Sequence, residues 1–201
     1  MDLSTMRTLV RRDLKDEDNS NYRWQDNEID RAIHRAVAEL SRHVPREMKT
    51  TIATADGSRD IDIVALTDRV SVDRVEFPVG ETPRRFQRFV LFADVITLTG
   101  DNEGDGGDCY IYWGKVHTLD EATSTVPSHL EDILALGAAA YAVLALTQYR
   151  TDVAGIGGDR ADSDYRRWGT GMLREFKSQL RRFGRNRKLK KSTLYQGDDN
   201  E

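Results

Sequence analysis

Residues 133–146 constrain the fold more than any other stretch of this chain, because they are apolar on every face of the helix they would form. A helix that is hydrophobic all round is buried, either in a protein core or in a membrane. The run is shorter than the roughly 20 residues that a membrane-spanning helix needs. We therefore expect a buried helix at the centre of the core, with Gly137, Ala138 and Ala142 letting a neighbouring helix approach closely.

A second strong helical signal covers residues from about 25 to 44. The helix should stop before Pro45, because the residue that precedes a proline disfavours the helical conformation. Trp24 lies just before this helix and Glu28 lies in its first turn, so Ile29 can fold back onto Trp24 as a hydrophobic staple. The apolar stripe of the helix consists of Ile29, Ile33, Ala36, Val37, Leu40 and Val44.

Two more helices are predicted near the ends of the chain. Ser4 is a plausible N-cap for the first, whose apolar face is Met6, Leu9, Val10 and Leu14. Ser128 and Glu131 form the pattern of a capping box at the start of the apolar helix. The fourth helix follows a glycine-containing loop at 151–162. Its apolar face is Tyr165, Trp168, Met172, Phe176, Leu180 and Phe183.

The middle of the chain changes to strand-like patterns. Segments 49–54 and 59–64 flank an Asp-Gly turn at 55–58, which predicts a β-hairpin. Acidic and glycine residues make 100–108 typical of a turn. Further strands are indicated by alternating, β-branched or aromatic residues at 70–77, 86–92, 95–99 and 109–113.

Together these patterns predict an α+β fold, a bundle of about four helices with an inserted β-rich middle of hairpin and small sheet. The insertion would cover about 48–118 within a domain that spans residues 1–184. Residues 185–201 would form a flexible tail, first basic and then polar, because they lie beyond the last strong helical stripe.

The formal charge of −4 conceals an asymmetry between the body of the chain and its C-terminal part. Within 174–191, Glu175 is the only acidic residue, so the rest of the chain is clearly acidic. The basic residues of this stretch are Arg174, Lys177, Arg181, Arg182, Arg185, Arg187, Lys188, Lys190 and Lys191. Cys109 is the only cysteine, which favours a reducing cytoplasm. We expect no signal peptide, since the first residues lack its basic and apolar pattern.

One acidic segment resembles a calcium loop without completing it. Asp101, Glu103 and Asp105 fall at the first, third and fifth offsets, but Tyr112 stands where the loop needs a bidentate Glu. Its flanks are also strand-like, whereas the calcium loop lies between helices. We therefore expect Asp101, Glu103, Asp105 and Asp108 to form an exposed acidic hairpin loop without a metal ion.

No other pattern predicts catalysis, a metal or a cofactor. The glycine-rich segment 155–160 lacks the Lys-Ser/Thr ending of a phosphate-binding loop. The four histidines show no zinc-binding spacing with Cys109, which opens an aromatic strand and is expected to be a buried, inert thiol. The sequence therefore predicts a protein that is not an enzyme.

The basic C-terminal arm is the best functional signal, because its basic side chains alternate with apolar ones that can enter protein pockets. It can neutralise DNA phosphates, dock on an acidic protein surface or solubilise the end of the helix. We favour docking on a protein, since DNA-binding modules usually carry base-reading elements as well. The candidate partner-binding residues are Arg181, Arg182, Phe183, Arg185, Arg187, Lys188, Leu189, Lys190, Lys191, Leu194 and Tyr195.

This order of elements resembles the head-to-tail connector, or adaptor, proteins of tailed bacteriophages. The resemblance covers roughly residues 3–183 and rests on the motifs Trp24-Gln-Asp-Asn-Glu-Ile29, Val126-Pro-Ser-His-Leu130 and Leu136-Gly-Ala-Ala-Ala-Tyr-Ala142, with an aromatic-striped helix after them. Family members often carry Trp-Ser/Thr-Asp at the start of the second helix. Here Gln25 replaces the hydroxyl residue, and Asp26 is the alternative cap.

The resemblance implies a structural virion protein without enzymatic activity or cofactors. Family members form a ring, commonly of twelve copies, that binds the portal protein on one side and tail or stopper proteins on the other. DNA passes through the central channel. The ring would assemble in the host cytoplasm and lie in the neck between head and tail, with no membrane involved. An acidic body and a basic arm suit such head-to-tail contacts between copies.

In this family a C-terminal segment often reaches toward the portal, which would give residues 181–195 a docking role. The alternative function is a DNA-binding or packaging-associated module that uses the same basic arm.

Overall fold

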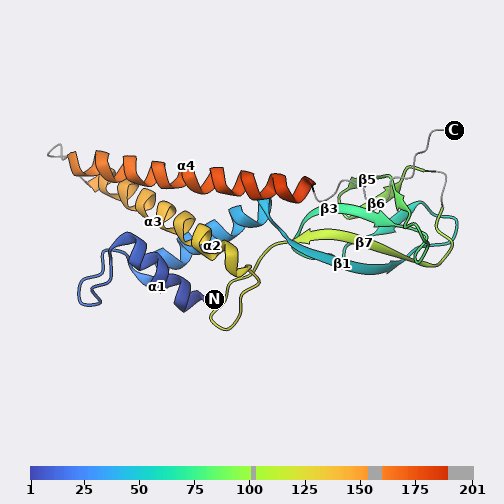
Figure 1. Ribbon diagram of the computed structural model, residues 1–201, viewed down its shortest axis with the longest axis horizontal. Helices are drawn as coiled ribbons and strands as arrows, with labels where there is room; N and C mark the ends of the chain where they lie inside the picture. Colours follow the sequence, from blue (N-terminus) through green and yellow to red (C-terminus); the bar gives the residue numbers. More distant parts are fainter. Residues whose placement is uncertain (101–102, 154–159, 190–201) are drawn as a thin grey trace. The chain divides into compact units, whose positions relative to one another are not determined.

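The computed structural model describes residues 1–100, 103–153 and 160–189, with the backbone alone for 148–153, 160–163 and 185–189 (Figure 1). The described residues divide into two compact units. Met1–Val44 and His117–Leu189 form a helical unit, and Pro45–Val116 form a β-rich unit. The described part of the chain contains four α-helices and two antiparallel sheets, which confirms the predicted α+β class.

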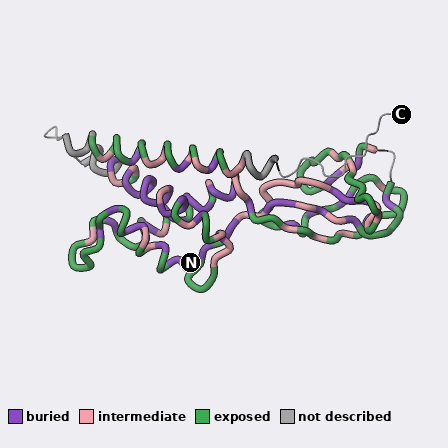
Figure 2. Tube along the Cα trace, viewed as in Figure 1, coloured by how far each residue is buried: buried purple, intermediate pink, exposed green. Residues whose placement is uncertain are grey.

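Helix α3 (Glu131–Val153) is the centre of the helical unit, where the sequence predicts a buried helix. It packs against α1 (Leu3–Leu14), α2 (Asp26–His43) and α4 (Arg160–Leu189). Figure 2 shows buried residues along the part of α3 that is coloured by burial. Within the described residues, Ser128–Thr147 is long and apolar enough to cross a membrane by composition, and 67% of its apolar window is buried inside the structure.

The contact between α3 and α4 depends on Gly137. A Cβ atom at this position would lie 2.7 Å from the ring of Phe176, closer than packed side chains tolerate. Phe176 is fully buried, and its ring meets Tyr141 edge-on with the centroids 6.3 Å apart. The absence of a side chain at Gly137 therefore lets Phe176 fill the contact, as the sequence predicts for the small residues of α3.

Two predicted helix starts are wrong in detail. Asp2, rather than Ser4, caps α1, because Ser4 already lies inside the first turn. The Asp2 carboxylate accepts a hydrogen bond from the Thr5 N–H at 2.7 Å, and this bond lowers the pKa of Asp2. The predicted capping bond of Ser128 is absent, because Ser128 lies within a 3₁₀ turn, η1 (Ser128–Leu130), that runs directly into α3.

The start of α2 follows the prediction more closely. Gln25 is its N-cap residue, and the Gln25 N–H donates to Glu28 Oε2 at 2.8 Å. Trp24 and Ile29 are both buried in the same core, as expected for the two partners of a staple. Asp26 does not substitute as the cap, because it is the first residue of the helix and its carboxylate binds Arg11.

The β-rich unit consists of two antiparallel sheets around a second core. The larger sheet has the order β1-β7-β3-β4, with strands β1 (Arg46–Ala53), β7 (Asp108–Lys115), β3 (Arg69–Glu76) and β4 (Phe86–Gln87). The smaller sheet has the order β2-β6-β5, with strands β2 (Asp60–Asp62), β6 (Val95–Leu98) and β5 (Phe89–Phe92). The second core consists of Ile61, Ile63, Leu66, Val75, Phe77, Ile96, Leu98, Cys109, Ile111 and Trp113.

The predicted hairpin between 49–54 and 59–64 is wrong. The Asp-Gly turn exists, with Gly57 at a positive φ of 69°, but it carries the chain from one sheet to the other. Strand β1 pairs along its whole length with β7, and β2 pairs with β6. The turn itself is held by the acidic loop, since the Gly57 N–H donates to the Gly104 carbonyl at 2.8 Å. The segment 86–92, predicted as one strand, likewise divides between the two sheets as β4 and β5.

We predict that Gly137→Leu destabilises the protein by about 1–3 kcal/mol, because the new side chain collides with the buried Phe176 ring. Chemical unfolding followed by circular dichroism measures the change. Gly171→Ala in α4 is the matched control, since a Cβ there meets nothing within 4 Å. The control should gain up to about 1 kcal/mol from helix propensity. An unchanged unfolding midpoint for Gly137→Leu would contradict the close contact.

Candidate interaction surfaces

The described residues carry no arrangement that marks a metal centre, since no three His, Cys, Asp or Glu side chains among them are grouped to hold an ion. Cys109 is fully buried, as predicted, and burial raises its pKa to about 11. Its thiol is therefore protonated near neutral pH and inert as a nucleophile. The candidate functional features are surfaces of the two units.

A buried ion pair organises the loop between α1 and α2. Arg11 Nη1 donates to Asp16 Oδ2 at 2.8 Å, and each of the two side chains is only 6% exposed. Arg11 also donates to the Trp24 carbonyl at 3.0 Å and to Asp26 Oδ1 at 2.6 Å. Asp16 accepts from the backbone N–H groups of Arg23 and Trp24. Both charges are thus hydrogen-bonded on several sides, as a buried ion pair requires.

The same network ties the loop to α3. The Trp24 indole Nε1 donates to the Ala142 carbonyl at 3.1 Å. The ring of Tyr22 covers the Arg11 guanidinium, with its centroid 3.5 Å from the guanidinium carbon. The hydrogen bond from Arg11 also lowers the pKa of Asp26. Sequence reasoning missed this network, because the segment from Lys15 to Asn21 has only the polar composition of a surface connection.

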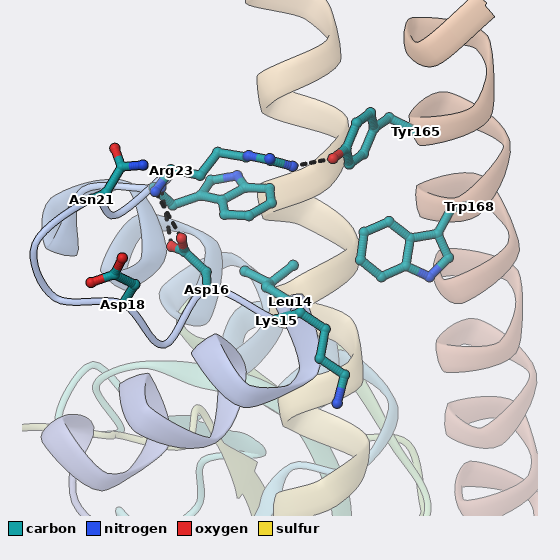
Figure 3. Close-up of a pocket in the computed structure, with 9 residues that line it drawn as sticks. Leu14, Lys15, Asp16, Asp18, Asn21, Arg23, Tyr165 and Trp168 are labelled. Carbon is teal, nitrogen blue, oxygen red and sulfur yellow. Dashed lines mark hydrogen bonds between the residues drawn. The ribbon is translucent and has the colours of Figure 1, made fainter.

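A pocket of about 750 Å³ lies beside this network in the helical unit (Figure 3). Its lining residues are Leu14, Lys15, Asp16, Asp18, Asn21, Arg23, Trp24, Tyr165 and Trp168. Arg23 donates a hydrogen bond to the Tyr165 hydroxyl, which links the loop to α4. Trp168 is 39% exposed. Its lining combines the aromatic rings of Trp24, Tyr165 and Trp168 with charged side chains of both signs.

The structure describes side chains for only three of the predicted partner-binding residues. Arg181 and Arg182 are exposed on α4, where they are free to meet a partner surface. Phe183 is half-buried and packs against the helical core, with its ring centroid 6.1 Å from that of His129. Of the others, Arg185, Arg187, Lys188 and Leu189 belong to the last turns of α4, whereas Lys190, Lys191, Leu194 and Tyr195 lie outside the described residues.

The β-rich unit exposes a surface, partly apolar and partly acidic, that sequence reasoning missed. We call it the outer face, and it consists of Asp60, Asp62, Val90, Phe92, Val95 and Thr97 on the smaller sheet. Phe92 is 82% exposed and Val90 is 56% exposed. Strand β5 reads Phe-Val-Leu-Phe without a polar residue, although it forms the edge of its sheet. The available sequence signal for this surface was a strand of four residues without a polar position.

Of the four carboxylates of the predicted acidic loop, Asp101 lies outside the described residues. Glu103 is exposed and forms an ion pair with Arg59 at 3.2 Å. Asp105 accepts a hydrogen bond from the Gly107 N–H at 2.8 Å, and Asp108 is exposed at the start of β7. These bonds engage Glu103 and Asp105 within the protein, and the absence of a metal stays a prediction.

Comparison with known proteins gives no family for this chain. No protein-family model matches it, and no curated protein sequence matches it significantly.

We predict that Arg11→Met destabilises the helical unit by about 3–5 kcal/mol, because it leaves Asp16 buried without its cation. The matched control is Arg12→Met, since the Arg12 side chain is 63% exposed and should change stability by less than about 1 kcal/mol. Urea unfolding compares the two variants. Similar losses in both would contradict a special role for the buried pair.

The pKa of Asp26 provides a second comparison of the Arg11→Met and Arg12→Met variants. Because the pKa of Asp26 is lower in the folded protein than its ordinary value of 3.8, the ionised carboxylate stabilises the folded state at pH values above 3.8. This stabilisation is lost as the pH falls through the lowered pKa. Arg11→Met should bring the Asp26 pKa back toward its ordinary value in an NMR titration, whereas Arg12→Met should leave it lowered.

We also predict that calorimetric titration of the protein with calcium shows no tight binding. The loop lacks the bidentate ligand, and Glu103 and Asp105 already have partners within the protein. Binding at micromolar concentration would overturn this interpretation and restore the metal site.

Proposed function

We propose that this chain is a ring-forming connector of a tailed bacteriophage, a structural virion protein that joins the portal vertex of the head to the tail. Its copies would associate head to tail around a channel through which DNA passes. The portal protein would bind one side of the ring, and tail or stopper proteins the other, with twelve copies expected. The proposal includes no enzymatic activity, cofactor or membrane.

The order of elements supports this proposal. A short helix, a second helix led by Trp24, a β-rich unit, the buried helix α3 and the long helix α4 follow one another along the chain. That is the order on which the resemblance to the connector family rests. The motifs before and after the β-rich unit belong to one helical core, which contains Trp24, Leu130 and Ala142. The Trp24 indole N–H also donates a hydrogen bond to the Ala142 carbonyl.

The observation that carries the proposal furthest is the outer face of the β-rich unit. The unit already has its own buried core, yet Val90 and Phe92 remain exposed on the smaller sheet. Contiguous exposed apolar side chains on a polar chain mark a surface that meets another protein. Residues 45–116 also contain thirteen acidic residues against nine basic ones, a balance that disfavours contact with DNA phosphates.

A second candidate function rests on the C-terminal part of α4. Arg181 and Arg182 are exposed there, in the most basic stretch of the chain. The alternative is therefore a DNA-binding or packaging-associated module whose affinity comes mainly from phosphate contacts.

Size in solution, with and without the portal protein of the same phage, separates these two functions. Gel filtration coupled to light scattering measures the mass of the protein in each sample. We expect an assembly of many copies, either for the chain alone or after portal protein is added. We expect only weak binding to duplex DNA. A chain that stays monomeric with portal, and binds DNA with a steep dependence on salt concentration, would contradict the connector and favour the alternative.

A further inference from the structure

We infer that the outer face binds the basic C-terminal segment, residues 187–195, of a second copy of this chain. This inference rests on the proposed ring, since it names a contact between neighbouring copies. It goes beyond that proposal by assigning both surfaces of the contact.

The register of the smaller sheet places the residues of the outer face together. Val95 pairs with Phe92 on one side and with Asp62 on the other, and Thr97 pairs in the same way with Val90 and Asp60. Side chains alternate between the two faces of a strand. Because Ile61, Ile96 and Leu98 are buried in the core, the paired residues project on the opposite face.

The outer face is apolar on one side and acidic on the other. Val90 and Phe92 belong to β5, whereas Asp60 and Asp62 belong to β2. Asp60 accepts from the Thr97 hydroxyl at 2.5 Å, and Asp62 accepts from the Val64 N–H at 2.9 Å. Within the described residues no ion pair joins either carboxylate to a cation. A ligand that fits this face therefore combines apolar side chains with positive charge.

The C-terminal segment of the chain has that composition. Its basic residues are Arg187, Lys188, Lys190 and Lys191, and its apolar residues are Leu189, Leu194 and Tyr195. Helix α4 ends at Leu189, and the twelve residues that follow lie outside the described part. Fully extended, the first six of them, up to Tyr195, would span at most about 20 Å. This is long enough for Leu194 and Tyr195 to cover a face built on strands of three and four residues.

The edge of the sheet offers a second means of binding. Strand β5 is the last strand of its sheet, so one side of its backbone has no strand partner within the described residues. An extended segment can add to such an edge through main-chain hydrogen bonds, while its side chains contact the face.

A second copy is the occupant that best explains these two complementary surfaces. The acidic and apolar face of one copy can bind the basic and apolar segment of the next copy. Such a contact is heterologous, because two different surfaces of the chain meet. Repetition of a heterologous contact closes a ring when the rotation between copies allows it. DNA is a poorer occupant, because Asp60 and Asp62 would repel its phosphates.

Disulfide cross-linking between two single-site variants tests the contact in the full chain. Chains carrying Phe92→Cys are mixed with chains carrying Tyr195→Cys under mild oxidation, and mass spectrometry identifies the dimer. The native Cys109 is fully buried and should not interfere. Phe92 is so exposed that its replacement opens no cavity. Thr51→Cys is the control, since Thr51 is exposed on β1 of the other sheet.

We expect the disulfide between positions 92 and 195 to form at least about tenfold faster than the one between positions 51 and 195. Equal rates would overturn the inference. A chain that carries both Phe92→Cys and Tyr195→Cys should form disulfides between copies. Bridges confined to single chains would also overturn the inference, because the arm would then cover the sheet of its own chain.

Charge reversal provides an independent test. Asp60→Lys with Asp62→Lys should weaken self-association about tenfold, and adding Lys190→Glu with Lys191→Glu should restore it. Asp56→Lys with Asp108→Lys is the matched control, because both residues are exposed outside the outer face. Failure of the second pair to restore association would contradict the contact.

The mass of the assembly distinguishes the inference from the proposed function. Variants with the Asp60→Lys and Asp62→Lys pair that form rings at the same protein concentration as the wild type would overturn this contact and leave the connector intact. A wild-type chain that remains monomeric with portal would overturn both.

Discussion

The buried ion pair of Arg11 and Asp16 is the interaction on which the helical unit depends. Neither charge is stable away from water without the other, and together they fix the turn from α1 into α2. That turn places Trp24 against α3, where its indole N–H meets the Ala142 carbonyl. Asp16 and Trp24 of this network also line the pocket beside Tyr165. A polar loop therefore connects α1, α2 and α3 through its hydrogen bonds.

Sequence periodicity predicted the helices well, because each apolar stripe is a local property of the chain. The buried α3, the burial of Trp24 and Ile29 in one core, and the close contact at Gly137 followed from spacing and side-chain size. The strand pairing did not, because β1 pairs with a strand more than 50 residues away while an Asp-Gly turn suggested a neighbour. The Arg11 network was also missed, since composition cannot distinguish a buried charge from a solvated one. Of the predicted binding arm, only Arg181, Arg182 and Phe183 have described side chains.

The two units differ in how fully they bury their apolar side chains. In the helical unit the described apolar stripes face α3, and Phe183 at the far end of the stripe of α4 still packs against that core. The β-rich unit buries Ile96 and Leu98 but leaves Phe92 and Val90 exposed on the opposite face of the same sheet. Exposed apolar strands favour association with other chains. An acidic β-rich unit and a basic C-terminal arm on one chain together favour repeated contacts between copies, which is the physical basis of the proposed connector.

The central claim, that copies of this chain close into a ring, is tested most directly by electron microscopy of the purified protein with and without the portal protein. We expect closed rings of uniform size with a central channel wide enough for duplex DNA, seen face-on in averaged images. Single compact particles without a channel, or open filaments of variable length, would contradict it.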